Sequence, residues 1–132
     1  MTTFANAPAL LITWLRLQPG LAGVTVAGAV PPSRATGSAP LVVVRRSGGV
    51  AERPVRDRPR LDFLCWHTTE YDASALAAIV RSLVHYTLPG QVLGGHTVYK
   101  PIEFSGPGLY PDPAGSNVPV VMFTEEIPIR VL

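Results

Sequence analysis

Residue types that could perform chemistry are few and scattered in this 132-residue chain. Its three histidines, His67, His85 and His96, occur singly, and none has a histidine or cysteine neighbour at the spacing of a zinc site. Cys65 and His67 stand two positions apart on a predicted strand, where residues share a face without any catalytic purpose. Paired carboxylates, a nucleophile-elbow serine and a phosphate-binding glycine loop are all missing from the sequence. We therefore expect no enzyme, no metal and no cofactor, and interpret Cys65 as a small buried hydrophobic residue.

The strongest charge pattern is a run of arginines between positions 45 and 60. Glu52 and Asp57 neutralise part of it, and no aromatic residues are interleaved to stack nucleic-acid bases. The net charge of +2 is also small for a dedicated nucleic-acid-binding protein. Two hypotheses stay open: a solvated loop, or an arm that pairs with acidic groups of a neighbouring subunit or faces a phosphate backbone. The run consists of Arg45, Arg46, Arg53, Arg56, Arg58 and Arg60.

Composition indicates one ordered domain with some apolar surface. Hydrophobic residues make up 47% of the chain and charged residues only 15%, which is less charge than a solitary domain usually keeps on its surface. We infer that part of the surface meets a partner. The apolar run at 8–17 is about half the length that spans a bilayer, and it lacks the order of features of a signal peptide. An unexported protein without a membrane helix is expected.

The N-terminal segment at 7–17 predicts a first helix, with Pro8 tolerated in its first turn. Leu10, Trp14 and Leu17 form one apolar stripe, while Leu11 and Leu15 lie on a second flank. A helix that is apolar over so wide an arc is either covered on two sides or lies at an interface. Leu11 and Leu15 are therefore candidates for a subunit interface.

The remaining elements follow from periodicity and turn residues. We expect an extended segment at 24–30, a turn-rich linker at 31–40, a strand from Leu41, and its partner at 60–68. The T-x-x-D pattern at Thr69 predicts a helix start, and this helix runs to about Tyr86. A strand at 98–104, restricted by Pro101 to an edge or a bulge, a loop at about 105–117 and a last strand at 118–132 complete the order. The second helix is predicted to face the sheet through Leu76, Ile79, Val80, Leu83 and Tyr86.

These elements predict an α+β fold. We expect a single domain spanning residues 1–132, in which a mainly antiparallel sheet of four to five strands is packed by two helices. A long hairpin arm at about 45–60 and the loop at about 105–117 extend from this core.

The order of elements and three short motifs resemble the tail terminator (tail-completion) proteins of long-tailed bacteriophages of actinobacteria. The motifs are V-R-D-R-P-R-L-D-F at 55–63, A-L-A-A-I-V-R-S-L at 75–83 and S-G-P-G-L-Y-P-D-P at 105–113. The resemblance is one of layout and covers roughly residues 5–131.

This resemblance implies a structural virion protein that forms a hexameric ring, caps the finished tail tube and joins it to the head-tail connector, with no cofactor and no reaction. Its partners would be copies of itself, the tail tube protein and the connector protein, and its location would be the virion after assembly in the host cytoplasm. In such a ring the arginines would cross the subunit interface or face the lumen, where DNA contact would be non-specific and sensitive to salt. Because DNA must slide through, we favour the interface. A head-tail connector, stopper or other neck protein is one alternative, and a small cytosolic adaptor that binds nucleic acid or protein is another.

Overall fold

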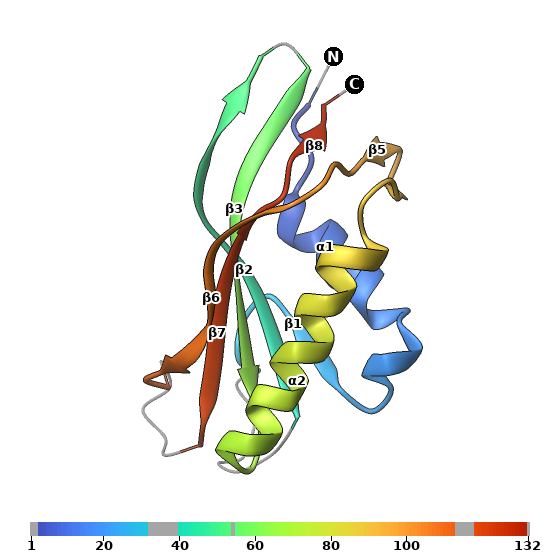
Figure 1. Cartoon of the computed structure of the whole chain (residues 1–132). Coiled ribbons are helices and arrows are strands. Elements are labelled where there is room, and N and C mark those ends of the chain that lie inside the picture. The colour runs from blue at the N-terminus through green and yellow to red at the C-terminus, as the bar shows by residue number, and fades with distance from the viewer. Residues whose placement is uncertain (1–2, 32–39, 54, 113–117, 132) are drawn as a thin grey trace.

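The chain folds as two helices packed on one face of a mostly antiparallel sheet, so the predicted α+β fold is confirmed (Figure 1). The computed structural model describes residues 3–31, 40–53, 55–112 and 118–131. The six-stranded sheet has the order β1-β2-β3-β7-β6, with β8 beside the far end of β3. Its strands are β1 (Thr25–Ala27), β2 (Leu41–Glu52), β3 (Arg56–Trp66), β6 (Ile102–Tyr110), β7 (Val120–Glu126) and β8 (Ile129–Arg130). Strand β1 lies within the extended segment predicted at 24–30, and β7 and β8 both lie within the predicted last strand at 118–132.

Helix α1 (Ala7–Arg16) begins where the Asn6 side chain accepts a hydrogen bond from the backbone N–H of Ala9. A 3₁₀ turn, η1 (Pro19–Leu21), follows it. The predicted core stripe is wrong at one end, because Leu17 is 74% exposed. The buried stripe instead consists of Ala7, Leu11, Trp14 and Leu15.

Helix α2 (Glu70–Ser82) begins as predicted, with the Thr69 hydroxyl accepting the N–H of Asp72. It continues into one π-helical turn, η2 (Leu83–Thr87). The predicted sheet-facing set is partly wrong, because Ile79 and Tyr86 are 41% and 87% exposed. Small side chains explain why a different face is buried. Alanines let the helix approach the sheet closely, on a face rotated away from Ile79. That face consists of Ala73, Leu76, Ala77, Val80 and, in η2, Val84.

The half of the sheet near Trp66 is buried on both faces. On the helix side, the rings of Phe63 and Phe123 stack with centroids 4.9 Å apart and packed among valines. On the opposite side, Leu64 and Trp66 belong to a second buried cluster with Val120. Both faces of this end of β3 are therefore covered.

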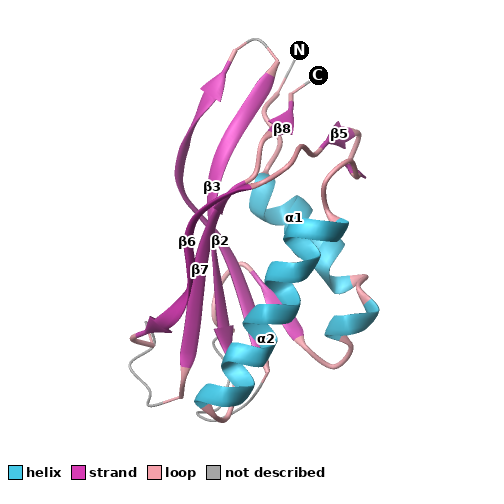
Figure 2. Cartoon of the chain, viewed as in Figure 1, coloured by secondary structure: helices cyan, strands magenta, loops and turns pink. Residues whose placement is uncertain are grey.

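Beyond this half, β2 and β3 continue as a hairpin that extends past the helices (Figures 1 and 2). The pairing slips by one residue between Arg46 and Gly48, which places a β-bulge where the hairpin leaves the core. We call residues 47–59, beyond this bulge, the arm. The predicted hairpin arm is confirmed, because β2 runs to Glu52 and β3 starts at Arg56, and the alternative of a solvated loop does not hold for these strands.

The C-terminal third differs most from the sequence-based expectation. The predicted loop at 105–117 is strand β6 as far as Tyr110, and residues 113–117 lie outside the described part. Val98 forms only an isolated bridge to Ile129, so the predicted strand at 98–104 begins at Ile102 instead, after Pro101. A small hairpin of β4 (Val92–Leu93) and β5 (His96–Thr97) was not expected. The predicted last strand is divided into β7 and β8 near Pro128. Most of the predicted linker at 31–40 also lies outside the described residues.

Candidate assembly surface

The arginines predicted to lie at a subunit interface or in a lumen are distributed over both faces of the β2–β3 hairpin. Residues that pair directly across a sheet share a face. Arg45 pairs with Asp62 and Val50 with Arg58, so both pairs lie on the face of the sheet away from the helices, together with Arg56 and Arg60. Arg46 pairs with Leu61 and lies on the helix side.

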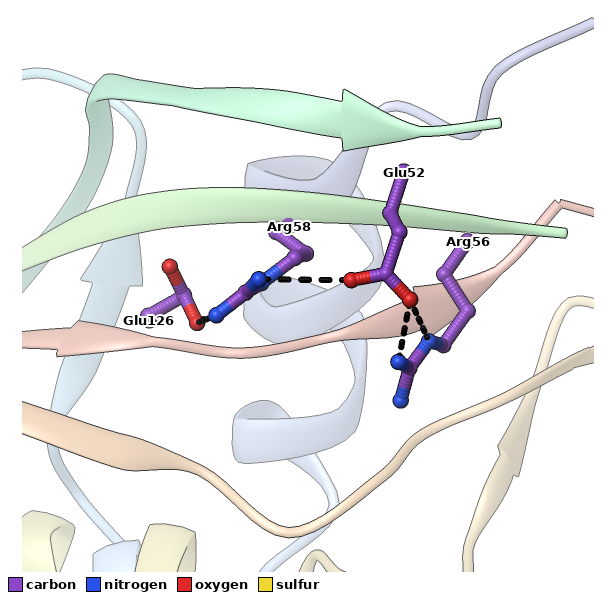
Figure 3. Close-up of polar contacts among 4 residues, drawn as sticks. All are labelled: Glu52, Arg56, Arg58 and Glu126. Carbon is purple, nitrogen blue, oxygen red and sulfur yellow. Dashed lines mark hydrogen bonds and ion pairs between the residues drawn. The ribbon is translucent and has the colours of Figure 1, made fainter. Parts of the chain in front are cut away.

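Glu52 links two arginines at the far end of the arm (Figure 3). Its Oε1 accepts from Arg56 Nε at 3.1 Å, and its Oε2 lies 3.3 Å from Arg58 Nη1. The hydrogen bond from Arg56 is the main cause that lowers the pKa of the Glu52 carboxyl. Arg58 also reaches across to β7, where Nη2 donates to Glu126 Oε2 at 2.8 Å. These exposed pairs orient the side chains more than they stabilise the fold.

Near the bulge, the Asp62 carboxylate accepts hydrogen bonds from three side chains on the two neighbouring strands. Its Oδ1 accepts from the hydroxyl of Thr124 at 2.8 Å and from that of Ser47 at 3.1 Å, and its Oδ2 lies 3.5 Å from Arg45 Nε. On the other face, Arg46 makes a two-pronged ion pair with the buried Asp57, at 2.9 and 3.2 Å. Both carboxylates therefore anchor the bulge.

Two arginines also lie over aromatic rings. The Arg60 guanidinium lies 3.9 Å from the centroid of Phe104 on β6, and that of Arg56 lies 5.4 Å from Tyr99. Arg53 is exposed at the turn. Each of the other five predicted arginines thus has a partner within its own chain, which holds the arm in one shape before any subunit meets it.

The two leucines predicted to lie at an interface occupy a different place. Leu11 and Leu15 are both 0% exposed and belong to the core between α1 and the sheet. Their second apolar flank is covered within the chain itself. Neither side chain leaves surface for a partner, so the prediction for them is not carried further.

Sequence reasoning placed only the first residues of β6, as far as Phe104, in a strand. Every residue of β6 is exposed, and Ile102, Phe104 and Leu109 are 48%, 50% and 63% exposed. The glycines and proline of the SGPG segment at 105–108 are typical of a loop, which concealed the rest of the strand. Apolar residues alternate with polar ones before SGPG, but Leu109 and Tyr110 after it are adjacent, so no alternation marks the second half of the strand.

The outward face of α2 is a second apolar surface. An open groove of about 420 Å³ lies along the end of the helix and η2. Tyr71 and Tyr86 stand out from the same helical segment at 83% and 87% exposed. Exposed tyrosines are common in protein interfaces because they combine an apolar ring with a polar end. The groove is lined by Ala78, Ile79, Ser82, Leu83, Tyr86 and Thr87.

One cluster of ionisable groups joins α2 to the sheet. His85 Nε2 lies 2.6 Å from Oε1 of the fully buried Glu125 and 3.7 Å from Glu103 Oε1. Burial raises the pKa of Glu125, whereas the hydrogen bonds from Arg81, at 2.6 and 2.8 Å, lower the pKa of Glu103. Ligand atoms of the histidine and both glutamates lie within 4.8 Å of one another, so the three could hold a metal ion. The Arg81 guanidinium on Glu103 supplies positive charge that opposes one.

The Cys65 and His67 pair offers no nucleophile. Cys65 is 0% exposed in the core, which confirms its prediction as a buried hydrophobic residue. Burial raises the pKa of its thiol to about 12, so it stays protonated at neutral pH. His67 Nδ1 is engaged locally, accepting a hydrogen bond from the Thr68 N–H at 2.8 Å.

Among the described residues, no helix has the length and apolar character needed to cross a membrane.

Comparisons with known proteins show a likeness of fold. No family model and no curated protein sequence matches the chain. A chain in the solved structure entitled "Virion of native gene transfer agent (GTA) particle" has a similar fold, with a TM-score of 0.61. The match covers 98% of this chain and 98% of that one, at 17% sequence identity. The likeness is therefore one of fold along the whole chain.

Proposed function

We propose that this protein is a structural virion protein: a tail terminator that forms a hexameric ring, caps the tail tube and joins it to the head-tail connector. The observation that carries the proposal is the whole-length likeness of fold to a chain of a gene transfer agent virion. At 98% coverage of both chains, the likeness extends over the helices, the sheet and the hairpin together. The layout of the sequence, which resembles tail terminators, supports the same role independently.

The surface of the chain supports an assembly role over a catalytic one. Apolar side chains on β6 and on the outer side of α2 are exposed, as expected of a subunit that buries them in contact with other subunits. The one group in the described part of the chain whose side chains could together hold a metal ion consists of His85, Glu103 and Glu125, and its carboxylates are engaged by Arg81 and His85. Ring formation uses the exposed surfaces, and no reaction is required.

The arm is proposed to lie at the subunit interface. Arg56 and Arg58 already pair within the chain, with Glu52 and Glu126. Because these side chains are held in place, a neighbouring subunit can bind them with little further loss of side-chain entropy. Lumen-facing arginines would instead hold the DNA backbone that must slide past.

Light scattering and negative-stain imaging of the purified protein, across a range of concentrations and salt levels, test this function. Closed rings, or monomers that become rings when tail tubes are added, are the expected result. Rings that do not bind tubes would favour a connector, stopper or other neck protein. Monomers that ignore tubes but retain nucleic acid at low salt would replace the proposal with the adaptor.

The interface role of the arm has its own test. Arg56→Glu combined with Arg58→Glu reverses the charges on the face away from the helices and should abolish or weaken rings. Lys100→Glu, which changes an exposed cation outside the arm, should leave them intact. Circular dichroism confirms that each variant folds. Normal rings from the double variant would remove the arm from the interface.

A further inference from the structure

The sheet ends in two open edges. Strand β1 pairs with β2 only at residues 41–43, so no described strand pairs with the outer edge of β2 from Val44 to Glu52. On the opposite side, β6 pairs with β7 and has no described strand on its outer edge. Backbone N–H and C=O groups along both edges are available to another strand.

The β6 edge carries few of the features that protect an isolated edge strand. It has no lysine or arginine, and Ile102, Phe104 and Leu109 are exposed on it. The register on β7 shifts twice, between Glu103 and Ser105 and between Ser105 and Gly108, and Pro107, which has no N–H, lies in the second shift. The residues paired on either side of these shifts, 102–103 and 108–110, keep their backbone donors. An apolar edge of this kind is a template for pairing with another chain.

We propose that β6 of one subunit pairs with the uncovered part of β2 in the next subunit, so that neighbouring sheets join into one. The inference rests on the proposed ring and specifies how its subunits meet. The pairs β2–β3, β3–β7 and β7–β6 are all antiparallel, so β6 runs opposite to β2. A rotation about an axis along the strands preserves each strand's direction, and therefore brings the neighbour's β6 antiparallel to β2. The contact is head-to-tail, which closes into a ring.

A second copy of this chain fits these edges better than an unrelated protein does. The two edges lie on opposite sides of one sheet, so each supplies what the other needs. Their charges do not repel: the segment 45–60 has six arginines against Glu52 and Asp57, and β6 has no basic residue, its one acidic residue being Glu103, which pairs with Arg81 in its own chain. Val50, 71% exposed on the arm, can meet the apolar side chains of β6.

Disulfide trapping tests the contact. Val50→Cys is combined in turn with Ile102→Cys, Ser105→Cys or Tyr110→Cys, all of which lie on the same face of the sheet as Val50. Within one chain the two edges are three strand spacings apart, about 14 Å, which is too far for a disulfide. The native Cys65 is buried and protonated, so it does not compete.

Under mild oxidation, at least one pair should give a ladder of covalent oligomers that ends at the ring size and is reversed by reductant. The matched control, Leu17→Cys with Ser105→Cys, places one thiol at the exposed end of α1 and should give no ladder. Rings that form with no crosslink from any of the three pairs would overturn the edge pairing and leave the ring intact. Monomers at every concentration and with tail tubes would overturn the proposed function and the pairing with it.

A single substitution gives a second readout without oxidation. Leu109→Lys adds a charge to the outermost strand at a side chain that is 63% exposed, so the subunit should still fold. We expect loss of rings at concentrations where the unaltered protein is fully assembled. Leu17→Lys, at a side chain that is 74% exposed at the end of α1, should leave the rings unchanged. Rings from Leu109→Lys that match those of the unaltered protein would overturn the pairing.

Discussion

The two halves of the β2–β3 hairpin are built from the same pair of strands but are held by different forces. The half at residues 41–44 and 61–66, which we call the base, is buried on both faces, with Phe63 on one side and Trp66 on the other. In the arm, every residue of β2 is exposed, and ion pairs through Glu52 and Asp57 replace the apolar contacts. Figure 2 shows that the helices pack beside the base of the hairpin, whereas the arm extends beyond them.

The difference teaches that one hairpin can be both a core element and an exposed, charged surface. The transition occurs at the bulge between Arg46 and Gly48, where Asp57 and Asp62 fasten one strand to the next. Stability should therefore be concentrated in the base, and recognition in the arm and the open edges.

The largest effect is expected from Phe63→Ala in the base. The ring is 0% exposed and stacked on Phe123, so its removal leaves a cavity in a close-packed region. The free energy of unfolding should fall by about 3–5 kcal/mol, measured by urea denaturation. Val50→Ala in the arm is the matched control and should change it by no more than about 0.5 kcal/mol. Similar losses from the two variants would contradict the division between base and arm.

A smaller effect, visible as a change in pH dependence, is expected from Glu125→Gln. Burial raises the pKa of Glu125 in the folded chain above its ordinary value of 4.5, so the folded state holds this proton more tightly than the unfolded state does. Its contribution to stability is present below about pH 4.5 and is lost as the pH rises through the raised pKa. Glutamine cannot titrate, so the variant should gain stability relative to the unaltered protein across that window.

Glu103→Gln, in the same cluster, should change the pH dependence of stability in the opposite direction. Arg81 lowers the pKa of Glu103, so the stability it contributes is present above about pH 4.5 and is lost as the pH falls through the lowered pKa. Thermal unfolding of the variants from acid to neutral pH should separate them. Equal pH profiles for both variants would show that the two carboxyls titrate as one unit instead.

The smallest effect on global stability is expected from Glu52→Gln in the arm. The carboxylate is exposed and screened by solvent, so the urea midpoint should stay where it is. The loss of its pairs with Arg56 and Arg58 should instead loosen the arm, and amide hydrogen exchange at 48–58 should become faster. A fall in the urea midpoint comparable to that of Phe63→Ala would mean that the arm is part of the cooperative core.

Local signals predicted much of the fold. The cap at Thr69 and the valines after Leu41 fixed a helix start and a strand, because each acts through neighbours in sequence. The part of strand β6 after Phe104 was missed because its pairing with β7 overrides the turn preference of SGPG. The exposure of Ile79 was missed because close packing through alanines decides which face of α2 is buried.

The site was less predictable than the fold. The arginines of the arm could be identified from composition, but their partners could not, since Arg58 meets Glu126 from a distant part of the sequence. The same holds for His85, Glu103 and Glu125, whose separations of about twenty residues form no motif. Leu11 and Leu15 were misplaced because a wide apolar arc can be covered within one chain as well as by another.

The two glycines that follow the bulge in β2 limit how the sequence of the arm can vary. Gly49 has a φ of +95°, and a Cβ at this position would lie 2.1 Å from the carbonyl oxygen of Arg58. Gly48, with a φ of +149°, is also in a conformation that other residues rarely adopt. In a deep mutational scan, both glycines should therefore be intolerant of substitution, whereas the exposed positions 50–52 of the same strand should accept many residues.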